Sequence, residues 1–274
     1  MRDILVHAAN FRAWSGGVEF AARLAASLDA LLTGAYIYPS PLYTMPPYGS
    51  PGLLAAILEN ARELEESARA AEKSFASWTA AFGATRSAWQ VAEGYLPDTL
   101  AHIANWNDLV VLQRDPAEPW GGPIDLGTLV LHVDAPCIVV PPKVTQPRLG
   151  CIALAWNGSP EAIRAIHAAL PLLQRAQRVV LFSGERREPF VEIGWKPPFD
   201  IAVHLARHAI EVERNEIFAR DERAGEALLE AAAKVGADLL VMGAYGRTRF
   251  SEWIFGGATR HVLHEATLPV LLRH

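Results

Sequence analysis

The sequence predicts an α/β protein made of two tandem copies of one domain, each with a five-stranded, mostly parallel sheet and helices on both faces. Two observations lead to this prediction. The same order of apolar runs occurs in both halves of the chain, and helix-like amphipathic segments separate the runs. Alternating strands and helices are typical of parallel sheets. At 274 residues and 51% apolar composition, each half is large enough to have its own core.

The repeat is visible in three pairs of apolar runs. Segment 3–10 matches 151–157, segment 107–112 matches 237–242, and segment 135–140 matches 268–272. The halves differ in length at one place, because the first half carries a helical pattern at 52–82 after a loop rich in Pro and Tyr. We expect the apolar stripe of this long helix to pack on the sheet as ordinary core, in preference to binding a partner.

The second half gives the clearest series of elements. We expect strands at 150–156, 178–182, 210–216, 238–242 and 270–272, and helices at 160–174, 198–208, 222–235 and 251–265. Ser159 is the expected N-cap of the first of these helices, with Pro160 in its first turn. The pattern restarts after Pro141 and Pro142, which predicts domains at 1–146 and 147–274.

Composition and charge exclude several classes of function. The net charge of −5 comes from interspersed acidic and basic residues, which gives no electrostatic footprint for nucleic acid or an anionic membrane. Neither a signal peptide nor a membrane span is readable, so we expect a cytoplasmic protein. Cys137 and Cys151 lie in apolar runs, and we expect both to be small buried hydrophobic residues.

A glycine-rich segment follows the apolar run 237–242. Its glycines, Gly243, Gly246 and Gly256, are separated by two and then by nine residues. A buried strand, a tight loop and a helix in this order form the place where α/β sheets bind nucleotides. Glycine accepts positive φ and lets a ligand approach the backbone N–H groups, and the dipole of the following helix favours an anion.

This spacing resembles the ATP-binding signature of the universal stress protein family, and the resemblance covers essentially the whole chain as two tandem copies. Two positions depart from the family pattern. The last glycine of the family signature is followed by Ser or Thr, where this chain has Gly257, with Thr259 two residues on. The first strand of the family ends in an Asp that contacts the nucleoside, where this chain has Asn157.

The resemblance implies a set of ligand contacts in the second half, with ATP and its Mg²⁺ as the expected cofactors. Residues expected to frame the adenosine are Ala155, Asn157, Met242 and Tyr245. Residues expected around the phosphates are Gly243, Gly246, Arg247, Gly256, Gly257, Ala258 and Thr259. In the first half, segment 113–123 has prolines in place of the first two glycines, so we expect that copy to have lost the nucleotide site.

The sequence shows no catalytic constellation. There is no Ser-His-Asp order, nucleophile elbow or Gly-Lys-Ser/Thr phosphate loop. His204 and His208, like His261 and His264, have metal-ligand spacing on a helix, but no further ligand is evident, and we favour solvated or capping roles over a metal site.

We therefore expect a cytoplasmic, non-catalytic module that senses a nucleotide or another ligand in the stress response. Two alternatives stay open, an ATP-cleaving enzyme of a related nucleotide-binding α/β fold and an interaction protein that needs no nucleotide. The apolar last strands, 137–140 and 270–272, would lie at sheet edges that need cover. We expect them to cover each other as a pseudo-dimer within the chain, and a homodimer of two chains is a further expectation.

Overall fold

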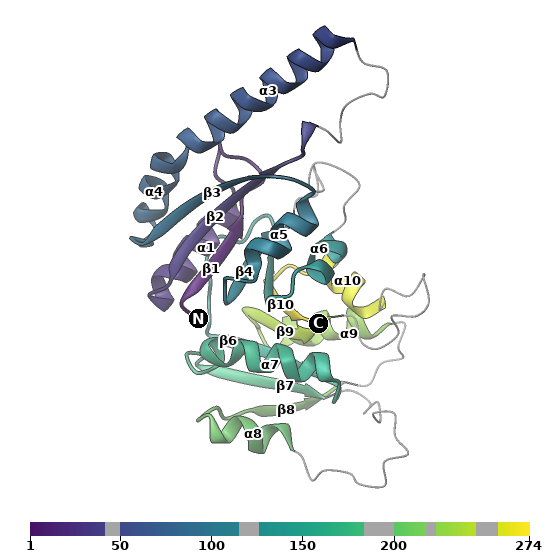
Figure 1. Cartoon of the computed structure of the whole chain (residues 1–274). Coiled ribbons are helices and arrows are strands. Elements are labelled where there is room, and N and C mark those ends of the chain that lie inside the picture. Colours follow the sequence, from purple (N-terminus) through teal and green to yellow (C-terminus); the bar gives the residue numbers. More distant parts are fainter. Residues whose placement is uncertain (42–49, 115–125, 184–199, 218–222, 245–256) are drawn as a thin grey trace. The chain divides into compact units, whose positions relative to one another are not determined.

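The computed structural model describes residues 1–41, 50–114, 126–183, 200–217, 223–244 and 257–274 (Figure 1). The chain divides into two compact units. The first consists of Met1–Ala135 and Pro142–Gln146, and the second of Pro136–Pro141 and Pro147–His274. The last strand of the first half thus belongs to the second unit, and the domain boundary expected near residue 146 stays a prediction.

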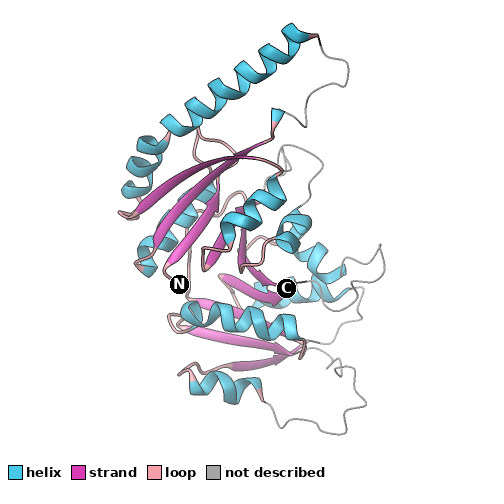
Figure 2. Cartoon of the chain, in the orientation of Figure 1, coloured by secondary structure: helices cyan, strands magenta, loops and turns pink. Residues whose placement is uncertain are grey.

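The first unit contains four parallel strands in the order β3-β2-β1-β4. These strands are β1 (Asp3–His7), β2 (Leu31–Tyr38), β3 (Ser87–Glu93) and β4 (Leu109–Gln113). The helices are α1 (Gly16–Leu28), α3 (Pro51–Ala70), α4 (Glu72–Ala81), α5 (Leu96–Ala104) and α6 (Leu126–His132). Strands β1, β2 and β4 are largely buried, as their apolar runs predict for a parallel sheet between helices (Figure 2), whereas the edge strand β3 has no buried residue.

The second unit repeats this order and adds two strands, its own last strand and the last strand of the first half. Its strands are β5 (Cys137–Val140), β6 (Cys151–Trp156), β7 (Arg178–Ser183), β8 (Glu213–Glu216), β9 (Leu239–Gly243) and β10 (Val270–Arg273). Its helices are α7 (Pro160–Leu173), α8 (Ile201–Arg207), α9 (Ala224–Lys234) and α10 (Gly257–Glu265). The strand order is β5-β10-β9-β6-β7-β8. Every neighbouring pair is parallel except β5 with β10, so the predicted mostly parallel α/β class is confirmed.

The two last strands of the repeats pair with each other. Strand β5 runs antiparallel to β10, with Ile138 opposite Leu271 and Cys137 opposite Leu272. The side chains of both strands are buried, apart from the partly exposed Arg273. The expectation that one apolar last strand covers the other is therefore confirmed, and the pseudo-dimer as a whole stays a prediction.

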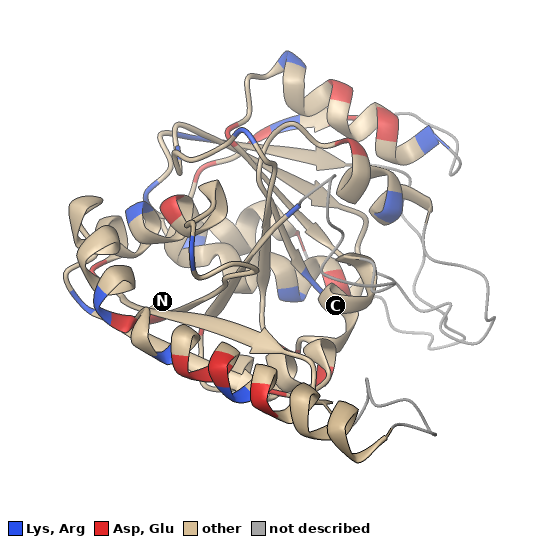
Figure 3. Cartoon of the chain, turned by 90° about the horizontal axis from the view of Figure 1, so that it is seen from above, with Lys and Arg blue, Asp and Glu red and all other residues tan. Residues whose placement is uncertain are grey.

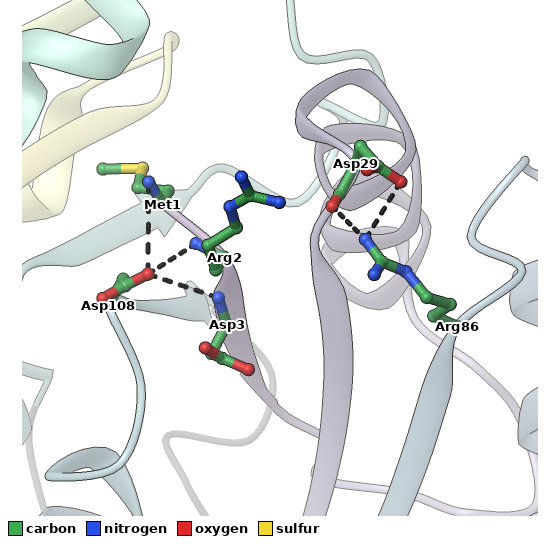
Figure 4. Close-up of polar contacts among 6 residues, drawn as sticks. All are labelled: Met1, Arg2, Asp3, Asp29, Arg86 and Asp108. Atoms are coloured by element: carbon green, nitrogen blue, oxygen red, sulfur yellow. Dashed lines mark hydrogen bonds and ion pairs between the residues drawn. The ribbon is translucent and has the colours of Figure 1, made fainter.

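An aspartate before the fourth strand of each repeat ties that strand to the first strand. The Asp108 carboxylate accepts hydrogen bonds from the backbone N–H groups of Arg2 and Asp3 (Figure 4). Asp238 does the same in the second unit, where Cys151 N lies 2.9 Å from its Oδ2. The two aspartates occupy equivalent positions of the repeat predicted from the sequence. Each accepts a hydrogen bond from a backbone N–H group at the start of the first strand of its repeat.

The structure corrects the single long helix expected at 52–82. The segment forms two helices, and α3 ends at Ala70 where Ala71 serves as its C-cap and as the N-cap of α4. The expected packing of the stripe on the sheet is met only near this junction, where Ala68, Ala71 and Phe75 are buried. The first turns are exposed, with Leu53 at 46% and Leu58 at 42% of full exposure, so the expectation of ordinary core is wrong there.

Figure 1 shows the start of α3 extending past the strands of its unit. The charged residues of α3 lie in its later turns, and its first turns contain no charged residue (Figure 3).

Cys137 and Cys151 are buried and form no disulfide, and their burial is as predicted from their apolar surroundings. Burial raises the pKa of the Cys137 thiol to about 12, so this thiol stays protonated at neutral pH and behaves as a small hydrophobic group. Among the described residues, no helix has both the length and the apolar character needed to cross a membrane.

Candidate functional site

The strand order of the second unit places its switch point between β6 and β9. The chain leaves β6 toward β7 on one side and reaches β9 and β10 on the other side. The ladder between β6 and β9 ends at the pair Leu154 and Val241, and both strands continue for two more residues. Open parallel sheets bind ligands beyond the carboxyl ends of their strands at such a point.

Gly243 ends β9 in direct contact with the first turn of α7. An added Cβ at Gly243 would lie 2.6 Å from the backbone nitrogen of Ala162 and 2.8 Å from the Cβ of Glu161. No side chain fits there without moving the helix, so glycine is needed for the close approach of helix and strand. The first glycine of the motif therefore serves packing at the site that the sequence assigned to phosphates.

The start of α7 is held by the side chains that precede it. Ser159 is the N-cap, as predicted, and its hydroxyl accepts a hydrogen bond from Ala162 N at 3.2 Å. Asn157 accepts from Ser159 N at 3.0 Å through its Oδ1. One lone pair of this amide oxygen is thus engaged within the turn.

Helix α10 begins at Gly257 and packs closely on α9. Gly225 makes this contact possible, because an added Cβ there would lie 2.9 Å from the carbonyl oxygen of Ala258. Thr259 is buried at 5% exposure, while Gly257 is exposed and has nothing within 4 Å of an added Cβ. A serine side chain would thus have open space at position 257.

In the first unit the corresponding contact between strand end and helix start has its glycine on the helix and its side chain on the strand. The strand-end residue is Gln113, and the residue two after the helix N-cap Ser15 is Gly17. Gln113 Oε1 accepts a hydrogen bond from Gly17 N at 2.7 Å, and an added Cβ at Gly17 would lie 2.7 Å from Gln113 Cβ. In this unit the glutamine side chain covers the amide that a ligand would otherwise meet at the start of α1.

The neighbouring strand of the first unit ends in a buried histidine. His7 is 5% exposed, and burial lowers its pKa to about 4. The imidazole is therefore neutral at physiological pH.

The described part of the chain contains seven of the residues expected to contact ATP. They are Ala155, Asn157, Met242, Gly243, Gly257, Ala258 and Thr259. The ends of β6 and β9 hold the first four of them near the switch point, and the others form the first turn of α10. Tyr245, Gly246, Arg247 and Gly256 lie outside the described residues.

Sequence reasoning missed a contact between helices α7 and α8. The Nε2 atoms of His167 and His204 lie 3.2 Å apart, and the ring of His208 packs edge-on against His204 at 4.9 Å between centroids. Burial, together with the nearby charges of His167, His208 and Arg207, lowers the pKa of His204. No group of three or more His, Cys, Asp or Glu within the described ranges forms a metal site.

Two further residues at the strand ends were not assigned to the site by the sequence. Glu161 was noted only as following the helix start, and Arg273 was not singled out, since the expected strand ends at residue 272. Each has a buried polar side-chain atom without a hydrogen-bond partner, Glu161 Oε2 and Arg273 Nη1. A charged residue that ends an otherwise apolar strand is a signal that pointed to Arg273 in the sequence.

The comparisons with known proteins agree on one family. The model of the universal stress protein family matches residues 152–274. A universal stress protein of Thermus aquaticus is 33% identical over 131 residues, which cover 44% of this chain and 96% of that protein.

Solved structures match the whole length of the chain. A universal stress protein from Archaeoglobus fulgidus superposes with a TM-score of 0.64 at 13% identity, covering 99% of this chain and 96% of the other. A universal stress protein from Pseudomonas aeruginosa superposes with a TM-score of 0.58 at 17% identity, covering 100% of this chain and 93% of the other. At these identities the structural matches establish a shared fold.

Proposed function

Because the chain belongs to the universal stress protein family, we propose that it is a cytoplasmic stress-response protein without catalytic activity whose second unit binds ATP. The ligand is inferred from the glycine spacing at 243–256 and from its place between β9 and α10. The binding event would report nucleotide availability to partners of the protein.

One observation carries this proposal, the difference between the two units at equivalent strand ends. In the first unit Gln113 covers the first turn of α1 and uses its N–H group. In the second unit Gly243 adds no side chain at that point. This contrast supports a ligand in the second unit and a structural role for the first.

The described residues fit a nucleotide better than a resident metal. They contain no group of three or more His, Cys, Asp or Glu that could hold an ion. Mg²⁺ usually keeps several waters and binds through substrate phosphates, so here it would arrive with ATP. The same lack of acidic ligands within the described residues favours binding over ATP cleavage.

Calorimetric titration of the purified chain with ATP, with and without Mg²⁺, tests the proposal. We expect saturable binding that Gly246→Val and Gly256→Val weaken sharply, since a β-branched side chain would obstruct the backbone approach. Gly257→Ser should strengthen binding by about 1 kcal/mol, the net contribution of one hydrogen bond.

Other outcomes would favour the alternative functions. A steady-state ATP turnover of about 1 per second or faster that the glycine variants abolish would indicate an enzyme. Absence of ATP binding at millimolar concentration would favour an interaction protein that needs no nucleotide. A homodimer of two chains is part of the proposal and is tested by sedimentation of the purified protein.

A further inference from the structure

Two side chains at the carboxyl ends of the strands of the second unit carry opposite charges that lack hydrogen-bond partners. Glu161 Oε2 and Arg273 Nη1 are both buried, and neither atom has a hydrogen-bond partner. Buried charged groups in proteins are normally paired, because water no longer solvates them. Two such atoms at one sheet edge need an explanation.

Both residues lie beside Gly243. The Cβ of Glu161 is 2.8 Å from the place where a Gly243 side chain would begin. Arg273 is the register partner of Gly243 in the parallel ladder between β10 and β9. Register partners in a ladder point to the same face of the sheet, and at Gly243 that face meets α7. Glu161 and Arg273 therefore border the same point from a helix and from a strand.

The neighbouring groups supply no hydrogen bond to Glu161 Oε2 or Arg273 Nη1. Arg164 approaches the other carboxylate oxygen of Glu161 at 3.7 Å, beyond hydrogen-bond distance, and is itself 54% exposed. No ion pair joins Glu161 to Arg273 among the contacts of the described residues. Because Arg164 approaches Oε1, the Oε2 atom still lacks a donor.

At the equivalent strand end and helix start of the first unit, the polar groups are hydrogen-bonded to each other. There the oxygen beside the helix start belongs to Gln113, and the Gly17 N–H group donates to it. In the second unit Gly243 takes the place of Gln113 and has no side-chain oxygen, and the carboxylate beside the start of α7 belongs to Glu161. The Oδ1 atom of the nearby Asn157 accepts a hydrogen bond within its own turn. Glu161 Oε2 is thus a buried acceptor without a donor at this edge, in a place where Gln113 closes the first unit.

We propose that Glu161 and Arg273 together bind a ligand that carries both hydroxyl groups and a phosphate. Glu161 Oε2 accepts a hydrogen bond from a sugar hydroxyl, and Arg273 Nη1 donates to a phosphate oxygen. A bare cation would leave Arg273 unmatched, and a bare phosphate would be repelled by Glu161. The inference rests on the proposed function and narrows it to a ligand with a free sugar hydroxyl, either a nucleotide or a simple sugar phosphate.

Glu161→Gln tests the first contact, because it keeps the shape of the side chain and removes its charge. Titrations use ATP and 2′,3′-dideoxy-ATP, which lacks the sugar hydroxyls. We expect Glu161→Gln to weaken ATP binding about tenfold and to leave dideoxy-ATP binding unchanged, as hydrogen bonds to charged groups suggest. Equal affinity of variant and wild type for ATP, or equal losses for both ligands, would overturn the proposal.

Arg273→Gln tests the second contact with ATP, AMP and adenosine. Binding of ATP and AMP should weaken about tenfold, whereas adenosine, which has no phosphate, should bind as it does to the wild type. Glu230→Gln and Arg207→Gln are the matched controls. Both remove a charge from an exposed helical residue of the same unit, and they should change no affinity.

Two more titrations separate this inference from the proposed function. If Gly256→Val binds ATP normally while Glu161→Gln does not, the proposed role of the glycine segment is overturned and the proposed role of Glu161 and Arg273 is supported. If Gly256→Val loses ATP binding while Glu161→Gln keeps it, the glycine segment is supported and the role of Glu161 is overturned. Binding of ribose 5-phosphate but not ATP, with loss in Glu161→Gln, would assign the site to a sugar phosphate. No binding of ATP, AMP or ribose 5-phosphate at millimolar concentration would overturn both.

Discussion

At the residue scale, Gly243 lies at the proposed ligand site of the second unit and is also needed for the packing that stabilises this unit. A methyl group at this position would meet the backbone of α7 at 2.6 Å, and backbone cannot rotate away as a flexible side chain can. We expect Gly243→Ala to lower the free energy of unfolding by about 1–3 kcal/mol, a usual cost of overpacking. Urea denaturation monitored by circular dichroism measures this change.

Gly257 supplies the control for this prediction. It is exposed and has open space around an added Cβ. Gly257→Ala should leave stability unchanged or raise it by up to about 1 kcal/mol, because alanine favours the helix that begins there. Equal losses in the two variants would show that the contact between Gly243 and α7 is not tight.

His7 predicts a pH dependence of stability. Burial lowers its pKa to about 4 in the folded chain, against about 6.5 when unfolded. The fold therefore favours the neutral ring, so the contribution of His7 is fully present above about pH 6.5. It is lost as the pH falls toward 4, by about 3 kcal/mol in total.

Unfolding free energies of the wild type and His7→Gln, measured from pH 7.5 to pH 4, test this expectation. The variant should lose less stability than the wild type over that range, because glutamine does not titrate. Parallel pH profiles would mean that His7 is not the group responsible.

At the element scale, α3 is exposed at its start and is buried near its end at Ala68. Leu53 and Leu58 near its start are exposed, whereas Phe75 of the following helix α4 is buried at 1% and contacts the ring of Trp89. Leu53→Ser and Leu58→Ser should each change stability by no more than about 0.5 kcal/mol. Phe75→Ala should cost about 3–5 kcal/mol. A loss above 2 kcal/mol in either serine variant would show that the start of α3 is packed.

The same helix shows what sequence periodicity predicts and what it does not. The apolar spacing from Leu53 to Phe75 correctly predicted helical structure. It also predicted burial along the whole stripe, which failed because burial depends on whether a sheet lies underneath. The break at Ala71 carries no Gly or Pro signal, so propensity alone did not indicate it.

The candidate site was predictable to a similar extent. The motif from Gly243 onward and the cap at Ser159 were evident from sequence, since caps and glycine turns depend on neighbouring residues. In the first unit the strand-end residue has the side chain (Gln113) and the helix residue is glycine (Gly17), whereas in the second unit the strand-end residue is glycine (Gly243) and the helix residue has the side chain (Glu161). This exchange was not evident from the sequence, because each pair joins residues far apart in the chain. The contact between His167 and His204 was missed for the same reason.

At the scale of the whole molecule, the second unit includes a strand from the first half of the sequence. Strand β5 pairs with β10 and gives the apolar edge of that strand a hydrogen-bonded neighbour. We expect a fragment of residues 136–274 to unfold at a higher urea concentration than a fragment of residues 147–274, which leaves β10 uncovered. The shorter fragment should also self-associate in sedimentation experiments.

Equal midpoints and equal monomeric behaviour of the two fragments would show that β5 is dispensable. A matched control is the longer fragment with Ile138→Pro, which removes a backbone donor in the middle of β5. It should behave like the shorter fragment.

The central claim is that the second unit holds the ligand and the first does not. Hydrogen–deuterium exchange of the full chain, with and without saturating ATP and Mg²⁺, tests it most directly because it reports on both units in one sample. We predict slower exchange with ATP at the end of β9, the first turn of α7 and the start of α10, and no change at the end of β4 or the start of α1. Protection at β4 and α1, or protection in neither unit, would contradict the account.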